Sequence, residues 1–242
     1  MRLCVAQTRP LKGDIEKNIE SHKKIIELAS RIQADLVFFP ELSLTGYEPK
    51  MARKLASFEN DNRYNIFQTL SEANNIIICI GTPLKSDFGI FISMLIYEPT
   101  KLVQIYSKQF LHDDELPYFI AGKKQVYLHA SPDKLAPAIC YELSVPEHSA
   151  NAFRNGANIY VASVAKTKDG VEKAKKILSE IAKKYAMIVV MSNCVGVCDD
   201  FECGGASAVW NMHGELIEQL DDKNEGILIF DTETTEVITI YI

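Results

Sequence analysis

The sequence lacks the features of secreted, membrane-spanning and nucleic-acid-binding proteins. Its N-terminus opens on a strand-like segment, Leu3 to Ala6, where a signal peptide would have a basic region and an apolar core. Its longest apolar runs are far shorter than the roughly 20 residues of a membrane-spanning helix. A net charge of −6 leaves no basic surplus for neutralising phosphates. We therefore expect a cytoplasmic protein with no nucleic-acid partner and no membrane partner.

The chain also has no Pro/Gly/Ser-rich linker, no low-complexity stretch and no internal repeat. With 242 residues, 47% of them hydrophobic, it is long enough and apolar enough to bury a substantial core. We therefore predict that residues 1–242 form a single domain.

Cysteine is present without the signs of a disulfide framework. Six cysteines in a chain of this length, with no secretory signal, are typical of reduced thiols. Cys194, Cys198 and Cys203 form a cluster in the sequence, but their spacing matches no familiar zinc pattern and no histidine lies nearby. We therefore expect no metal site.

Helical and strand-like segments alternate along much of the chain. Apolar residues at helical spacing predict helices near residues 14–32, 62–73, 146–155 and 170–185. Short apolar runs predict strands at 35–39, 75–81, 135–139, 159–163, 188–192, 206–210 and 227–231, and a hairpin formed by 89–97 and 102–106. This mixture predicts an α/β fold in which helices cover mixed sheets.

Three reactive side chains follow predicted strands. Glu41 and Cys140 each end an apolar run, and Lys108 follows the second strand of the predicted hairpin. Ligand groups in α/β folds commonly lie beyond the carboxyl ends of strands. Taken singly, each residue also has an ordinary interpretation: a helix cap, an inert buried cysteine and a solvated lysine. The combination of carboxylate, ammonium and thiol favours a catalytic site.

The segments around these residues resemble, in the same order, the glutamate, lysine and nucleophile motifs of the nitrilase (carbon-nitrogen hydrolase) superfamily. The matching segments are Phe39 to Tyr47, Tyr106 to Leu111, Ile139 to Glu147, Ser192 to Gly196 and Gly204 to Asn211. The resemblance covers nearly the whole chain. It implies a four-layer α-β-β-α sandwich, a homodimer and a reaction that needs no cofactor.

The chain departs from the family pattern in two places. Glu142 and Leu143 stand where many members carry an Asp-Arg or similar pair. Phe110 replaces a common histidine after the lysine motif, with His112 close by. These departures leave the catalytic interpretation intact and leave the subfamily and the substrate open.

The resemblance implies a role for each reactive residue. Cys140 would attack an amide and carry a thioester, with Glu41 as the general base and acid. Lys108 and the backbone N–H of Tyr141 would hold the oxyanion. Glu115 would orient the substrate or the lysine, as a second glutamate does in family amidases, although its segment could equally be an ordinary acidic loop.

The substrate is expected to be a small amide. The residues expected to bind it are aromatic, and each could instead be ordinary core: Tyr47, Tyr118, Phe119 and Tyr141. True nitrilases generally show Cys-Trp-Glu where this chain has Cys140, Tyr141 and Glu142, so an amide is favoured over a nitrile. Two alternatives stay open: a nitrilase, and a binding protein that keeps the fold without turnover. The ammonia could also pass to a separate partner.

Overall fold

The structure is a computed structural model that describes residues 1–130 and 132–242, and its main feature is a pair of stacked β-sheets. One sheet has seven strands: β1 (Arg2–Gln7), β2 (Leu36–Phe38), β3 (Ile77–Ser86), β4 (Gly89–Tyr97), β5 (Gln104–Ser107), β14 (Gly226–Asp231) and β15 (Val237–Tyr241). The other has six: β6 (Leu128–Ala130), β7 (Asp133–Ile139), β8 (Ile159–Ser163), β9 (Ile188–Ser192), β12 (Ala208–Trp210) and β13 (Leu216–Gln219).

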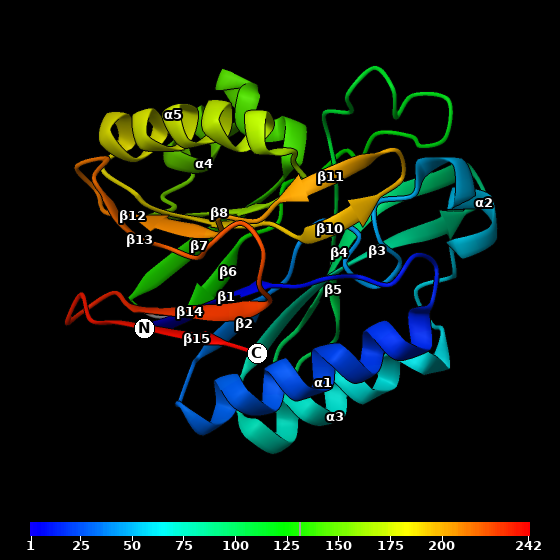
Figure 1. Ribbon diagram of the computed structural model, residues 1–242, viewed down its shortest axis with the longest axis horizontal. Helices are drawn as coiled ribbons and strands as arrows, with labels where there is room; N and C mark the ends of the chain where they lie inside the picture. Colours follow the sequence, from blue (N-terminus) through cyan, green and yellow to red (C-terminus); the bar gives the residue numbers. More distant parts are fainter. Residues whose placement is uncertain (131) are drawn as a thin grey trace.

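Helices cover the outer face of each sheet, so the molecule has four layers, α-β-β-α (Figure 1). The α-helices are α1 (Ile15–Arg31), α2 (Ala52–Leu55), α3 (Asn65–Asn74), α4 (Pro146–Arg154) and α5 (Lys168–Tyr185), and short 3-10 helices lie at Pro49–Met51, Asn62–Tyr64 and Cys140–Ser144. Helices α1 and α3 pack on the seven-stranded sheet, and α4 and α5 pack on the six-stranded sheet. The predicted sandwich is confirmed.

The strand order brings the carboxyl ends of parallel strands together. In the seven-stranded sheet the order is β15-β14-β1-β2-β3-β4-β5, with β1, β2 and β3 parallel to one another. In the six-stranded sheet it is β13-β12-β9-β8-β7-β6, with β7, β8 and β9 parallel. The side chain of Ser163, at the end of β8, donates a 2.7 Å hydrogen bond to the carbonyl of Phe39, just after β2. The carboxyl ends of the two parallel sets therefore face each other.

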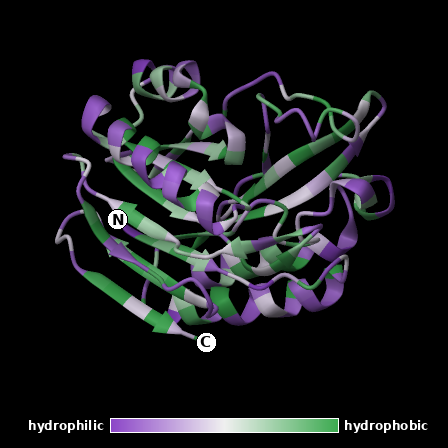
Figure 2. Cartoon of the chain, turned by 45° about the horizontal axis from the view of Figure 1, so that its top comes forward, coloured by the Kyte–Doolittle hydropathy of each residue, from purple (hydrophilic) through white to green (hydrophobic). Residues whose placement is uncertain are grey.

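The helices begin where the sequence supplies a capping side chain. Asp14 accepts a hydrogen bond from the backbone N–H of Lys17 at the start of α1, and Thr167 accepts one from Gly170 at the start of α5. The inner face of α5 is the predicted apolar stripe, which buries Val171, Ala174, Leu178, Ile181 and Ala182. In Figure 2 the strands are largely green and the outward faces of the helices largely purple, as expected for helices that cover a sheet.

The main core lies between the two sheets. It includes Leu3 and Phe38 from the seven-stranded sheet, and Leu135, Ile159 and Val190 from the six-stranded sheet. An antiparallel hairpin, β10 (Val195–Cys198) and β11 (Phe201–Gly204), packs at one end of this core. Within the described residues, no helix is both long and apolar enough to cross a membrane.

The predicted elements are present, with ends that differ by a few residues. The strands predicted at 159–163 and 188–192 have the observed bounds, and the predicted hairpin is the antiparallel pair of β4 and β5. The structure adds a hairpin that joins β3 to β4, and five strands that were not predicted from the sequence: β6, β10, β11, β13 and β15. Four of these five are only three or four residues long. No side chain of β13 or β15 is fully buried, and Thr239 interrupts the apolar run of β15.

Candidate active site

Each of the three reactive side chains lies just after a strand of the sandwich. Glu41 lies three residues beyond β2, Lys108 directly follows β5, and Cys140 directly follows β7. Strands β2 and β5 belong to one sheet and β7 belongs to the other. The three groups therefore meet where the carboxyl ends of the two sheets face each other, as the strand-end pattern predicted.

The backbone at Cys140 makes a sharp turn. Its φ is +46°, a left-handed conformation that non-glycine residues rarely adopt, and it is the first residue of the 3-10 helix that follows β7. Strand β7 ends directly before Cys140. Cys140 is therefore presented at the edge of the sheet, where it is partly exposed, whereas Cys4 and Cys79 are fully buried within strands.

Glu142 holds this turn against the end of β5. Its carboxylate accepts hydrogen bonds from the backbone N–H of Ile139 at 2.7 Å, from that of Gln109 at 2.5 Å and from the hydroxyl of Tyr106 at 2.7 Å. Burial raises the pKa of Glu142 to about 7, against the effect of these donors. Family motifs in the sequence drew attention to Glu142 but did not predict this structural role.

Lys108 lies between two carboxylates in a fully buried position. Its Nζ is 2.7 Å from Glu41 Oε1 and 2.6 Å from Glu115 Oε1, and none of the three side chains has more than 1% of its surface exposed. Burial alone would lower the pKa of Lys108, but Glu41, Cys140 and Glu115 outweigh it and raise the pKa. The lysine is therefore held in its charged form.

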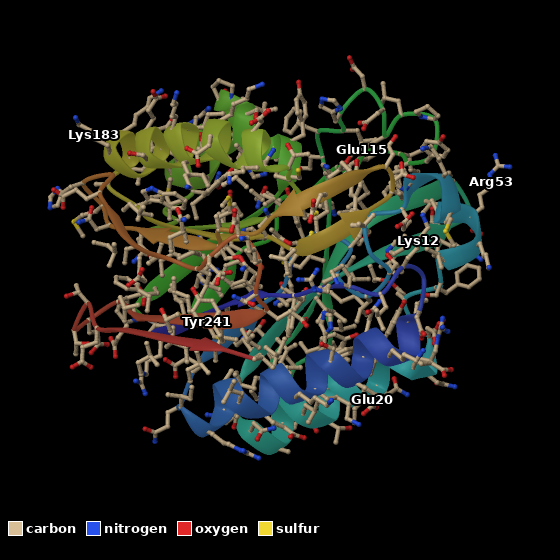
Figure 3. All side chains as sticks on the ribbon, viewed as in Figure 1. Lys12, Glu20, Arg53, Glu115, Lys183 and Tyr241 are labelled. Carbon is tan, nitrogen blue, oxygen red and sulfur yellow. The ribbon has the colours of Figure 1, made fainter. Side chains whose placement is uncertain are left out.

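Glu115 is fixed by further donors. The hydroxyl of Tyr47 donates to its Oε1 at 3.0 Å, and the backbone N–H of His112 donates to its Oε2 at 2.8 Å. Figure 3 labels Glu115 on the loop that follows β5. The structure thus brings the second glutamate predicted from the sequence into contact with Lys108.

Glu41 and Cys140 both have raised pKa values. Burial raises the pKa of Glu41, and the positive charge of Lys108 acts against this rise. Glu41 Oε2 has no hydrogen-bond partner among the described residues. Burial and the charge of Glu41 raise the pKa of Cys140 to about 11, although Lys166 and Lys108 favour its thiolate. At neutral pH the thiol is therefore protonated and needs a nearby base before it can act as a nucleophile.

Cys140, Lys108 and Glu115 open into a cavity of about 280 Å³. It is lined by Tyr47, Lys108, His112, Asp114, Glu115, Cys140, Tyr141, Ala165, Lys166, Thr167, Gly170 and Phe201. Tyr47 and Tyr141 therefore lie where the sequence analysis expected substrate-binding residues. Tyr118 lies at the surface and Phe119 is buried in the core, and neither is among the described residues that line this cavity.

The sequence analysis missed two parts of the cavity wall. Lys166 and Thr167 follow the end of β8, so the strand-end pattern that identified Cys140 could also have identified them. Phe201 comes from the β10–β11 hairpin, and its ring centroid lies 5.8 Å from that of Tyr47. That hairpin has no pattern in the sequence that would place it beside the other wall residues.

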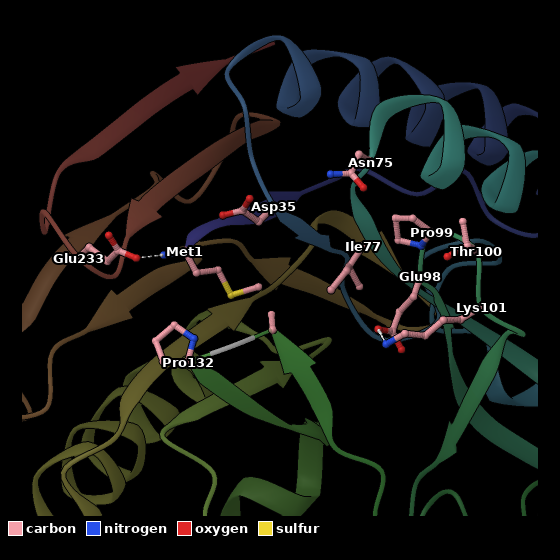
Figure 4. A pocket seen from close by; sticks show the side chains of 11 residues that line it. Met1, Asp35, Asn75, Ile77, Glu98, Pro99, Thr100, Lys101, Pro132 and Glu233 are labelled. Carbon is pink, nitrogen blue, oxygen red and sulfur yellow. Dashed lines mark hydrogen bonds and ion pairs between the residues drawn. The ribbon is translucent and has the colours of Figure 1, made fainter.

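A second, larger cavity of about 520 Å³ lies at another edge of the sheets (Figure 4). Two of its charged groups are already paired, the N-terminal ammonium with Glu233 and Lys101 with Glu98. Its described lining contains no cysteine, so it offers no thiol nucleophile. The smaller cavity at Cys140 is therefore the candidate active site.

Comparison with known proteins agrees with this geometry. The chain is 25% identical over 98% of its length to a glutamine-dependent NAD(+) synthetase of Thermotoga maritima, and covers 42% of that protein. It is 23% identical over 98% of its length to a protein of Staphylococcus aureus named hydrolase in agr operon, and covers 93% of it. The chain thus spans less than half the length of the synthetase.

The fold also matches solved structures. A cysteine-to-alanine mutant of the amidase from Nesterenkonia sp. AN1, in complex with butyramide, superposes with a TM-score of 0.89. The two sequences are 20% identical, and the match covers 97% of this chain and 92% of that one. Residues 2–239 match the sequence profile of the family described as carbon-nitrogen hydrolase. The chain therefore belongs to the carbon-nitrogen hydrolase family.

Proposed function

We propose that this protein is an amidase that cleaves the C–N bond of a small amide through a thioester on Cys140. One observation carries the proposal: the Cys140 thiol, at a strained turn, shares a cavity with Lys108 and Glu115, and the buried Glu41 pairs with the same lysine. A scaffold without turnover gains nothing from burying two carboxylates and a lysine beside a thiol, because burying charges is costly.

In the first half of the reaction the Cys140 sulfur attacks the amide carbon while Glu41 takes the thiol proton. The carbonyl oxygen becomes an oxyanion. A lysine ammonium has three N–H donors, and the carboxylates of Glu41 and Glu115 engage two, which leaves one for the oxyanion. The backbone N–H of Tyr141 supplies a second donor.

In the second half the C–N bond breaks as Glu41 returns the proton to the departing nitrogen, so that ammonia or an amine leaves. The acyl group stays on Cys140 as a thioester. Glu41 then takes a proton from a water molecule that attacks the thioester, and the acid leaves as the thiol is regenerated. The proton and the nucleophile are restored at the end of each cycle without a cofactor.

The cavity also favours a class of substrate. Lys166 is half-buried in its wall and forms no ion pair with any of the described residues, and the neighbouring Thr167 caps the N-terminus of α5. An ammonium beside a helix N-terminus attracts an anion. A small cavity of this kind suits a short amide whose far end carries a carboxylate. The curated relatives named glutamine-dependent synthetases are consistent with such a substrate.

A matched pair of lysine variants tests this specificity. Lys166→Met should lower kcat/KM for a carboxylate-bearing amide such as succinamate or glutamine by about tenfold or more, the order expected for one lost charge contact. Butyramide hydrolysis should fall less, because butyramide loses only the effect of Lys166 on the Cys140 thiol and no charge contact of its own. Lys168→Met is the control, because Lys168 is exposed and pairs with Asp222. An equal loss for both substrates, or none, would exclude the proposed role of Lys166.

A substrate panel separates the amidase from its alternatives. Release of ammonia from amides, with nitriles inert, supports an amidase; faster turnover of nitriles than of amides would make the protein a nitrilase. Tight binding of amides with neither turnover nor acylation would indicate a binding protein that keeps the fold.

A further inference from the structure

Three cysteine side chains converge beneath the β10–β11 hairpin. The Sγ atoms of Cys194 and Cys203 are 2.8 Å apart, those of Cys194 and Cys198 are 3.7 Å apart, and all three lie within 4.8 Å of one another. Each residue is at most 2% exposed. We refer to Cys194, Cys198 and Cys203 as the thiol cluster.

Strand register explains why residues with an unfamiliar spacing meet. Cys203 on β11 pairs with Gly196 on β10, and Cys194 and Cys198 lie two residues to either side of Gly196. Side chains two residues apart on a strand point to the same face. The hairpin therefore gathers onto one side three thiols that are separated by three and four residues in the sequence, a spacing that the comparison with zinc motifs could not recognise.

The thiol cluster differs from the other buried cysteines of this chain. Cys4 and Cys79 lie within strands, among apolar side chains, as free cysteines usually do. In the thiol cluster the sulfur atoms contact one another, and S–H groups are weak donors and acceptors that gain little from such contacts.

We propose that the thiol cluster is a binding site for one thiophilic metal cation of the class of Zn²⁺ or Cu⁺. Thiolates are the ligands that these ions prefer, and three protein ligands are sufficient when a water or an open position completes the site. With metal–sulfur bonds of about 2.3 Å, tetrahedral sulfur ligands lie about 3.8 Å apart. The Cys194–Cys198 separation fits, and the Cys203 sulfur has to move about 1 Å from Cys194.

A disulfide explains the thiol cluster less well. A bond between Cys194 and Cys203 would need their sulfur atoms, 2.8 Å apart, to approach by about 0.75 Å, since the bonded distance is about 2.05 Å. It would use two of the three sulfur atoms and leave Cys198 without a role. A cation uses all three.

The bound cation would hold in place the β10–β11 hairpin, which forms part of the wall of the candidate active site. Phe201, at the start of β11, lines the cavity beside Tyr47. At the other end of β11, the backbone N–H of Gly204 donates a 2.8 Å hydrogen bond to the carbonyl of Lys166. The cluster thus lies between two parts of the wall. Its proposed role is to hold this hairpin in place, with no part in the reaction itself.

The test is a metal titration of the full chain, purified without oxygen and carrying Cys140→Ser so that the reactive thiol does not compete. Zn²⁺ and Cu⁺ are added separately and counted by native mass spectrometry. We expect one ion per chain for at least one of the two metals, and a higher unfolding temperature when it is bound.

Single serine substitutions then locate the site. Cys194→Ser, Cys198→Ser and Cys203→Ser should each weaken binding about 100-fold or more, because even an outer-shell change costs about 10- to 100-fold. Cys79→Ser is the matched control, as it removes a buried thiol outside the cluster and should bind the metal as before. Circular dichroism shows which variants fold.

Differential alkylation gives a readout that does not depend on the variants. Protein that keeps all three thiols is unfolded in the presence of an alkylating reagent, once with the metal bound and once without it. The bound metal should protect all three cysteines together. Absence of binding for both metals would overturn the proposal. So would binding that survives in a folded Cys198→Ser variant, or a chain lighter by two hydrogens in which Cys194 and Cys203 form a disulfide.

Discussion

The Nζ atom of Lys108 lies 2.7 Å from Glu41 Oε1 in a position where neither side chain reaches solvent. Glu115 contacts the same Nζ atom, so two negative groups share one positive group. Such a cluster is stable only while every member stays paired. Lys108 contacts only one oxygen of Glu41, and the second oxygen has no hydrogen-bond partner among the described residues, so it is available for the proton transfer that we propose.

Lys108→Ala tests the value of that pairing. We expect it to destabilise the fold by about 3–5 kcal/mol, because it leaves two buried carboxylates without their cation, and to lower kcat by about 10²- to 10³-fold. Urea unfolding and amide turnover measure the two effects. In the double variant Lys108→Ala/Glu115→Gln, part of the lost stability should return, because one buried carboxylate is removed. None of the lost activity should return. Lys124→Ala, an exposed position, is the control. If Lys108→Ala is as stable as the wild-type protein, the pairing of Lys108 with Glu41 and Glu115 does not contribute to the stability of the fold.

Glu142→Gln tests the support of the Cys140 turn. The amide nitrogen of glutamine would face backbone N–H donors that now meet a carboxylate, so we expect a loss of about 1–3 kcal/mol in the free energy of unfolding and slower turnover. Glu147→Gln on the exposed side of α4 should change neither. A variant with wild-type stability and turnover would remove Glu142 from this role.

The same variant should change the pH dependence of stability. The folded pKa of Glu142 is about 7, above its ordinary value of 4.5, so the folded state binds this proton more tightly than the unfolded state does. That contribution to stability, about 3 kcal/mol, is complete below pH 4.5 and is lost as the pH rises towards 7. Glu142→Gln has no such group, so its unfolding free energy should fall less over that range. If the unfolding free energies of the two proteins change with pH at the same slope, the raised pKa of Glu142 is contradicted.

Glu41→Gln separates base catalysis from electrostatics. Turnover should fall by about 10²- to 10⁴-fold, since the thiol and the water lose their base. The charge of Glu41 raises the pKa of Cys140, so its removal lowers that pKa and increases the thiolate fraction at neutral pH. Alkylation of Cys140 by iodoacetamide should therefore continue at the wild-type rate or faster. Retained turnover would show that Glu41 is not the base.

Local patterns in the sequence predicted an α/β fold with helix-covered sheets and the main catalytic candidates, and the family resemblance implied the four layers. Apolar runs ending at a reactive residue located Glu41 and Cys140, and helical spacing located the inner face of α5. The rest depends on contacts between distant segments. The support of Cys140 by Glu142 and the approach of the thiols of Cys194 and Cys203 arise from tertiary packing and strand register, which spacing does not reveal.

Some predictions concern properties beyond the fold. The family resemblance implies a homodimer, and the sequence indicates a single domain. Both stay predictions, as do the roles assigned to Glu41, Lys108, Cys140 and Glu115. Light scattering over a range of protein concentrations tests the dimer: a mass near the 27.2 kDa of one chain at every concentration would contradict it.

The thioester on Cys140 is tested most directly by intact-mass analysis of the protein, quenched in acid soon after mixing with a panel of small amides. A productive amide should add the mass of its acyl group to Cys140, located by peptide mapping, while ammonia or an amine is released. Cys140→Ala should fold, gain no mass and release nothing. If the wild-type protein neither gains an acyl group nor releases ammonia or an amine with any amide, or if Cys140→Ala hydrolyses amides at the wild-type rate, the proposed mechanism is wrong.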